Sequence, residues 1–267
     1  MPQNVSRSSV VVGIDGSRSA LRAGLWAVDE ATTRDVPLRL IHVVQSTAFD
    51  TEQEVRDGEA ALHAVEYAIG QTGRDVEVES DVVQGPVVET LVEQSADASM
   101  ICLGSASSAL QAAKFVGATA SAVAAAASCP VAVIRTTDDG ASPSPPDVAV
   151  IVDDPSDLEA VLDAGVREAT LRHARLLVLN LTTARLHELL PEDVDRRVAD
   201  FLHGHPDVRH RSLMTPTDVA AFLAELDTPL RLVVVARGDA GTRLLGNYGR
   251  FMLRATDCSV LLLPPRR

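Results

Sequence analysis

The sequence predicts an α/β protein of two tandem domains, each built on a doubly wound parallel sheet flanked by helices. Its 267 residues suit two domains better than one. Two long stretches of the chain repeat each other. Hydrophobic residues make up 46% of the chain and aromatic residues only 3%. The interior must therefore be aliphatic, which favours buried parallel strands and Ala-rich helices.

The two copies begin alike. "VVVGIDGSRSALRAGLWAVDEA" starts at Val10 and "VAVIVDDPSDLEAVLDAGVREA" starts at Val148. Each copy indicates a strand, a turn that carries an aspartate, an amphipathic helix and a second strand. The turn aspartates, Asp15 and Asp153, lie 138 positions apart.

The two copies also end alike. "GATASAVAAAASCPVAVIR" starts at Gly117 and "GNYGRFMLRATDCSVLLLP" starts at Gly246, and both run through a helix to a cysteine and a final apolar strand. Cys129 and Cys258 lie 129 positions apart, against 138 for the aspartates, so the second copy is nine residues shorter between these anchors.

A Pro, Ser and Asp segment separates the copies. "TTDDGASPSPP", residues 136–146, has the composition of a linker and cannot contribute to a packed core. The sequence therefore predicts a first domain over residues 1–138, a linker over 139–146 and a second domain over 147–267.

Strands alternate with helices along the first copy. Strands are expected at 10–15, 38–44, 76–83, 99–103 and 131–135, and helices at 19–33, 52–70, 86–95 and 117–128. On the first helix, Leu21, Leu25 and Val28 are expected to share one face. Parallel neighbours need long right-handed crossovers, and ligands of such sheets bind beyond the carboxyl ends of strands where the strand order reverses. Asp15 and Gly104 are the expected flanks of that crevice.

Charge and composition exclude several partners. The formal net charge of -13 disfavours nucleic acid, since binding to a phosphate backbone relies on Lys and Arg. No apolar run approaches the roughly 20 residues of a bilayer span, and the polar start "MPQNVSRSS" is unlike a signal peptide. We therefore expect a cytoplasmic protein that does not bind membranes. The three cysteines lack CxxC spacing and are interpreted as buried thiols: Cys102, Cys129 and Cys258.

The histidines do not indicate a metal site. His203, His205 and His210 have no carboxylate or cysteine at a suitable interval, so a solvated loop is the favoured interpretation. His42 is interpreted as marking a strand end rather than as a catalytic base. Neither a metal site nor a catalytic residue is predicted.

A small-residue stretch carries the strongest functional signal. The chain contains no GxxxxGK[ST], no GxGxxG after the first strand and no GxSxG. In "LGSASSALQAAKFVGATASA", however, Gly104, Ser107, Gly117 and Ala118 have the spacing of a loop that leaves a strand, surrounds a polyphosphate and enters a helix. Glycines let backbone amides approach phosphate oxygens, and a helix start adds partial positive charge. Lys114 is the cation available within this loop.

At this point the chain resembles the universal stress proteins, in particular the tandem two-domain members found in actinobacteria. The resemblance covers nearly all residues and rests on "VVVGIDGS", "LRLIHVV", the Gly85-Pro86 pair and "SCPVAVIR". It implies a Rossmann-like fold of the adenine-nucleotide α-hydrolase type. The ATP-binding branch of the family carries Gly-x2-Gly-x9-Gly-Ser/Thr. Here Ser107 replaces the middle glycine and Ala118 replaces the hydroxyl residue.

The resemblance implies a nucleotide site in the first domain. Asp15 would accept a hydrogen bond near the adenine or ribose, and the main chain of Val43 would bind adenine. ATP is the implied ligand, with Mg²⁺ only if it accompanies ATP. The residues implied in the site are Ile14, Asp15, Gly16, Val43, Gly104, Ser107, Gly117, Ala118 and Thr119.

The second domain has lost most of this pattern. Asp154 and Pro155 follow Asp153 where Gly16 and Ser17 follow Asp15. The later loop, "ARGDAGTRLLGN", begins with alanine in place of the first motif glycine and brings an aspartate close to any phosphate. A comparable ATP site is not expected there.

Three functions remain open at this stage. The first is a nucleotide-responsive stress protein in which an adenine nucleotide in domain 1 regulates an interaction with an unknown protein partner. The alternative is an interaction or scaffold protein of the same fold that binds no nucleotide. A transferase or hydrolase of the α-hydrolase type is disfavoured because an SGGxDS-like loop and a nucleophile are lacking, so we expect no enzyme. In the family the terminal strands pair across a dimer, which implies an internal pseudo-dimer here and allows a homodimer.

Overall fold

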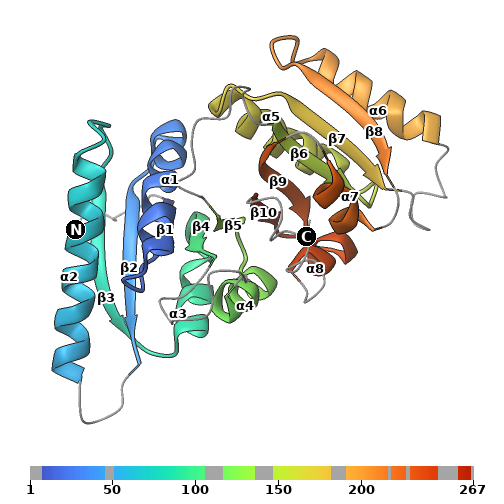
Figure 1. The fold of residues 1–267 in the computed structure, drawn as a ribbon. Helices are drawn as coiled ribbons and strands as arrows, with labels where there is room; N and C mark the ends of the chain where they lie inside the picture. Colours follow the sequence, from blue (N-terminus) through green and yellow to red (C-terminus); the bar gives the residue numbers. More distant parts are fainter. Residues whose placement is uncertain are drawn as a thin grey trace, which may run out of the picture. The chain divides into compact units, whose positions relative to one another are not determined.

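The computed structural model describes residues 8–45, 51–105, 117–135, 147–181, 191–215, 218–226, 229–245 and 258–265. Contacts divide the chain into two units, Met1–Arg135 and Thr136–Arg267. Each unit is an α/β body of its own (Figure 1). The predicted linker, 139–146, lies outside the described residues.

Unit 1 is a parallel sheet with strand order β3-β2-β1-β4-β5. Helices α1 and α2 contact each other, and α3 and α4 contact each other, so the helices form two pairs. The reversal of strand order falls between β1 and β4. The elements are β1 (Ser9–Gly13), α1 (Arg18–Arg34), β2 (Leu38–Val44), α2 (Thr51–Gly70), β3 (Val78–Gln84), α3 (Val87–Gln94), β4 (Ala98–Gly104), α4 (Ala118–Ala126) and β5 (Val131–Ile134).

Unit 2 has the same architecture. Its parallel strands follow the order β8-β7-β6-β9-β10, with the reversal between β6 and β9. The predicted fold class is therefore confirmed in both halves of the chain. The elements are β6 (Asp147–Val152), α5 (Leu158–Leu171), β7 (Leu176–Leu181), α6 (Pro191–His203), β8 (His210–Thr215), α7 (Val219–Glu225), β9 (Leu230–Ala236), α8 (Asp239–Leu245) and β10 (Ser259–Leu263).

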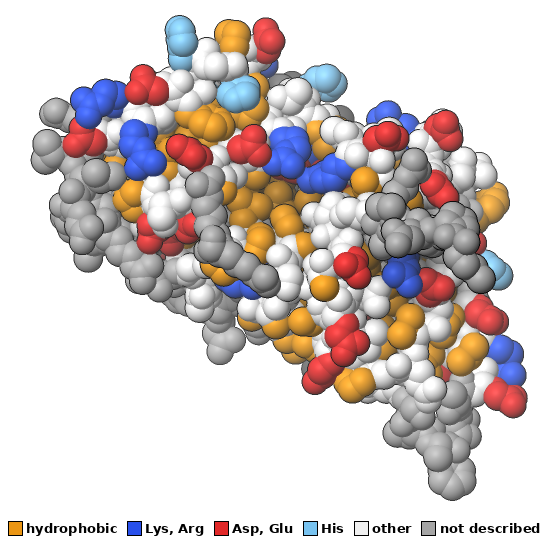
Figure 2. Space-filling view, turned by 180° about the vertical axis from the view of Figure 1, so that it is seen from behind, with side chains coloured by type: hydrophobic (Ala, Val, Ile, Leu, Met, Phe, Trp, Pro, Cys, Tyr) orange, Lys and Arg blue, Asp and Glu red, His pale blue; other side chains and the backbone are white. Residues whose placement is uncertain are grey.

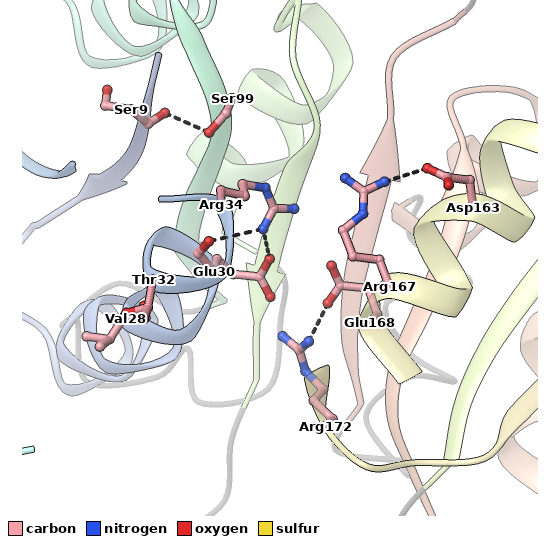
Figure 3. A network of polar contacts seen from close by, with 10 residues as sticks. All are labelled: Ser9, Val28, Glu30, Thr32, Arg34, Ser99, Asp163, Arg167, Glu168 and Arg172. Carbon is pink, nitrogen blue, oxygen red and sulfur yellow. Dashed lines mark hydrogen bonds and ion pairs between the residues drawn. The ribbon is translucent and has the colours of Figure 1, made fainter. Parts of the chain in front are cut away.

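The internal repeat extends to individual side chains. Near the end of α1, Arg34 pairs with the fully buried carboxylate of Glu30, and Arg172 pairs with the buried Glu168 at the same place on α5 (Figure 3). In each unit the residue that follows the arginine has a positive φ, 52° at Asp35 and 51° at His173. The repeat offset of 138 thus preserves a buried ion pair and the left-handed residue that ends the helix.

Aliphatic side chains fill both cores, as the composition predicts. The central strands β1 and β6 are buried, and Val10, Val12, Val148 and Val150 are fully inaccessible. The predicted face of the first helix is partly wrong. Leu21 and Leu25 are only half-buried, and besides Glu30 the buried residues of α1 are small residues and Val28: Ala20, Ala23, Gly24, Ala27 and Ala31. Small side chains bring α1 close to the sheet, which is tighter packing than a leucine stripe allows.

Charged side chains of both signs are interspersed on the surface. Figure 2 shows basic groups among acidic ones on the visible face rather than one continuous basic patch in the described residues. The large apolar side chains exposed in the described parts are Tyr67 and Met214. None of the helices in these parts combines the length and apolar composition that a bilayer span requires.

Candidate functional site

A cavity of about 320 Å³ opens in unit 1 at the reversal of strand order. It lies at the carboxyl ends of β1, β2 and β4, between these strand ends and the start of α4. Sheets of this type bind ligands at that position. Its lining residues are Gly13, Ile14, Asp15, Ser17, Ala20, Ile41, His42, Val43, Val87, Leu91, Leu103, Gly104, Gly117, Ala118, Thr119 and Ala120.

Asp15 is an exposed acid at the rim of the cavity. Its Oδ1 accepts a hydrogen bond from the Ser17 N–H at 2.9 Å, and the Ser17 hydroxyl in turn accepts from the Ala20 N–H at 3.1 Å, which caps α1. Between them, Gly16 has a φ of 78°. The turn therefore needs Gly16 for its left-handed conformation and holds the Asp15 carboxylate beside the cavity.

The start of α4 presents free donors to the same cavity. Gly117 is the N-cap and has no side chain to cap the helix. Among the described residues, the N–H groups of Ala118, Thr119 and Ala120 have no hydrogen-bond partner, and all three residues line the cavity. Such a group of amides, together with the partial charge of the helix, favours an acceptor or an anion.

Gly104 and Gly117 have different structural roles. A Cβ on Gly104 would lie 2.6 Å from the carbonyl carbon of Ser19 and 2.7 Å from the Ala20 nitrogen, so β4 can approach α1 only with glycine there. A Cβ on Gly117 would meet its nearest atom, the Ser105 carbonyl oxygen, at 3.8 Å. Gly104 is therefore required by packing, and Gly117 leaves the approach to the α4 amides open.

The structure gathers most of the predicted site residues around this one cavity. Ile14, Asp15, Val43, Gly104, Gly117, Ala118 and Thr119 all line it. Gly16 forms the turn behind Asp15 and does not line the cavity, and Ser107 lies outside the described residues. Sequence reasoning missed the apolar wall from α3, Val87 and Leu91, and it missed His42, whose position just before the predicted Val43 was the available signal.

At the corresponding place in unit 2 the acid is buried and bonds to a helix of its own unit. Asp153 is 7% exposed, and its Oδ2 accepts a hydrogen bond from the Ala240 N–H in the first turn of α8 at 2.9 Å. Pro155, at the position of Ser17, has no N–H to hold Asp153 as Ser17 holds Asp15. Asp154 makes that turn instead and accepts from the Ser156 N–H at 2.9 Å.

The described residues offer no cluster of three or more His, Cys, Asp or Glu that could hold a metal ion. The three cysteines are buried free thiols, as interpreted from the sequence: Cys102, Cys129 and Cys258. One resolved pKa shift lies in unit 2, where hydrogen bonds from Arg175 to Asp147 and the attraction between their charges raise the pKa of Arg175. This pair lies at the start of β6, and its role is structural.

Comparison with known proteins agrees with this fold. A profile of the Universal stress protein family matches residues 7–135. Universal stress protein Rv2624c of Mycobacterium tuberculosis (strain H37Rv) is 40% identical over 260 residues, 96% of each chain. Universal stress protein Rv2028c of the same strain is 32% identical over 98% of each chain. A universal stress protein from Archaeoglobus fulgidus superposes with a TM-score of 0.68 at 15% identity, over 97% of this chain and 96% of that one. This chain belongs to the universal stress protein family.

Proposed function

We propose that unit 1 binds an adenine nucleotide, ATP being the first candidate, and that binding regulates an interaction in a stress response. The cavity carries this proposal because its lining combines apolar side chains with a few hydrogen-bonding groups, among them Asp15 and the start of α4. Leu91, Leu103 and Ile41 offer a surface for a planar base, and Asp15 offers an acceptor. Ligand sites commonly have apolar walls and a few convergent polar groups.

The free amides of α4 support the phosphate or ribose end of the ligand. Three N–H donors without partners in the described residues lie at a helix start, where an anion is favoured by about 1 kcal/mol or less when exposed. Main-chain donors bind an oxygen without a lysine or arginine. Mg²⁺ would enter with ATP, since the described residues have no metal cluster of their own.

The proposal is for a binding protein and not for an enzyme. Hydrolysis of a phosphoanhydride requires a group that activates water and groups that stabilise the charge that develops. Among the described lining residues, Asp15 and His42 are the titratable groups. Asp15 already accepts a hydrogen bond from the Ser17 N–H, and His42 already donates one to the Ile14 carbonyl. Any turnover of ATP should therefore be slow.

Released nucleotide tests the proposal directly. The full chain is purified without added nucleotide and denatured, and the supernatant is analysed by absorbance and mass for ATP, ADP or AMP. Stoichiometric adenine nucleotide, or saturable binding of added ATP by calorimetry, supports the proposal. If neither occurs at millimolar ATP, the alternative of a scaffold that binds no nucleotide is favoured.

A further inference from the structure

The ladder between β1 and β2 ends one hydrogen bond early in unit 1. The last register pair is Gly13 with Ile41, and the Ile14 N–H donates to the Ile41 carbonyl at 2.8 Å. In a parallel ladder the next bond would run from the Val43 N–H to the Ile14 carbonyl. Among the described residues, however, the Val43 N–H has no hydrogen-bond partner.

The side chain of His42 makes a hydrogen bond to the Ile14 carbonyl, which the Val43 N–H would otherwise use. Its Nδ1 lies 2.8 Å from the Ile14 oxygen. Because a carbonyl oxygen only accepts, Nδ1 carries the hydrogen and donates it. The bond ties β2 to the end of β1 through a side chain, where the backbone of Val43 would otherwise do so.

Helix α2 packs against this imidazole at a glycine. Gly58 lies in the interior of α2, where glycine costs about 1 kcal/mol relative to alanine. A Cβ at position 58 would lie 2.4 Å from Cδ2, 2.9 Å from Cγ and 3.0 Å from Nε2 of His42. The His42 ring can therefore lie in its present position, bonded to Ile14, only because residue 58 is glycine.

Unit 2 shows the same ladder without the histidine. At the repeat offset, Asn180 stands for His42 and Val152 for Ile14. The Asn180 amide donates to Asp195 and Ser212, not to the Val152 carbonyl. There the ladder runs one pair further, to Val152 with Asn180, which is the pair closed by a bond from the Leu181 N–H to the Val152 carbonyl. Where no side chain takes the carbonyl, the backbone pairs.

We infer that His42 is a positioning residue that keeps the Val43 N–H available to a ligand. This inference rests on the proposed nucleotide site, in which the family resemblance already implies a contact from the Val43 main chain, and it adds the side chain that leaves this N–H unpaired. Val43 lies on the wall of the cavity, at a place where β1 has already ended. A free main-chain N–H at that point requires a hydrogen-bond acceptor, such as a ring nitrogen of a purine.

Two variants of the full chain separate the role of Nδ1 from the bulk of the ring. His42→Leu has an apolar side chain of similar size and no hydrogen-bond donor. His42→Asn places an amide nitrogen where Nδ1 lies, so it can still donate to Ile14. Hydrogen exchange of the Val43 amide is followed by NMR without ligand, and adenosine binding is measured by calorimetry.

In His42→Leu the Val43 N–H is expected to close the ladder, so its exchange slows about tenfold and adenosine binds about tenfold more weakly, the effect of one hydrogen bond. In His42→Asn both quantities should stay near those of the unmodified chain. Unchanged Val43 exchange in His42→Leu, or the same slow exchange in both variants, would overturn the inference. Because the exchange measurement needs no ligand, a chain that binds no adenosine refutes the proposed function while the role of His42 is still decided.

Discussion

The Asp153 carboxylate accepts a hydrogen bond from the Ala240 N–H, although 87 residues separate the two. The equivalent acid in unit 1, Asp15, is exposed and bonded to the Ser17 N–H, two residues along the chain. The same acid is thus engaged by the first turn of α8 in unit 2 and borders an open cavity in unit 1. We therefore expect ligand binding in one unit only.

Replacing Asp153 should lower stability without affecting ligand binding. Asp153→Ala removes a buried carboxylate that caps the first turn of α8, with an expected loss of about 1 to 3 kcal/mol. Asp153→Asn keeps an oxygen acceptor and should lose less. Urea unfolding followed by circular dichroism measures both variants. An Asp153→Ala chain as stable as the unmodified one would show that this bond does not hold α8.

The two glycines of the motif should respond differently to alanine. Gly104→Ala forces a Cβ against the backbone of Ser19 and Ala20, so unfolding free energy should fall by about 1 to 3 kcal/mol. Gly117→Ala brings a Cβ into ordinary contact with the Ser105 carbonyl oxygen at 3.8 Å and should cost only what alanine costs relative to glycine at an N-cap, about 1 kcal/mol or less. Thermal unfolding of the pair compares them. Equal losses would contradict the packing role of Gly104.

Gly58 offers a way to disturb His42 without replacing it. In Gly58→Ala the new Cβ must push the imidazole away, because the gap to Cδ2 is 2.4 Å. The bond to the Ile14 carbonyl should weaken, and adenosine affinity should fall several-fold, although alanine improves the helix by up to about 1 kcal/mol. Gly70→Ala, at the exposed end of the same helix with open space around it, is the matched control. Equal adenosine affinity in the two variants would argue against this coupling.

Asp147 is a buried acid and Asp163 an exposed acid of unit 2, and each pairs with a partly exposed arginine. Arg175 binds both oxygens of Asp147 at 2.9 and 2.8 Å, and Asp147 is 6% exposed, whereas Asp163 pairs with Arg167 at 64% exposure (Figure 3 shows the second pair). Asp147→Asn should therefore destabilise the chain by about 1 to 2 kcal/mol, because two charge-assisted hydrogen bonds to a buried carboxylate are weakened. Asp163→Asn should change unfolding by less than about 0.5 kcal/mol. The reverse order in chemical denaturation would refute this assignment.

The alternation of strands and helices made the fold predictable, and the repeat made it predictable twice. The expected elements of the first copy all occur, with ends displaced by up to two residues. The first strand ends at Gly13, one position earlier than its counterpart β6, because the Ile14 carbonyl bonds to His42 and not to the next N–H of the ladder. A side chain that replaces a backbone bond leaves no periodic signal in a sequence.

The site was predictable where it follows the chain and not where it depends on distant contacts. Asp15 and Gly117 were placed by their positions at a strand end and at a helix start, and Val43 was placed by the resemblance to the family. The need for glycine at 104 comes from a helix more than 80 positions earlier, and the closure at Asp153 comes from a later one. Such contacts appear only after the sheet has assembled.

Calorimetric titration of the full chain with ATP, repeated with Asp15→Ala, tests the central claim most directly. We predict one site per chain, and in Asp15→Ala an affinity lower by at least about tenfold with unchanged circular dichroism, since the exposed acid lies on the cavity and outside the core. Two equal sites, no binding at millimolar ATP, or an Asp15→Ala chain that binds as tightly as the unmodified one would contradict the account.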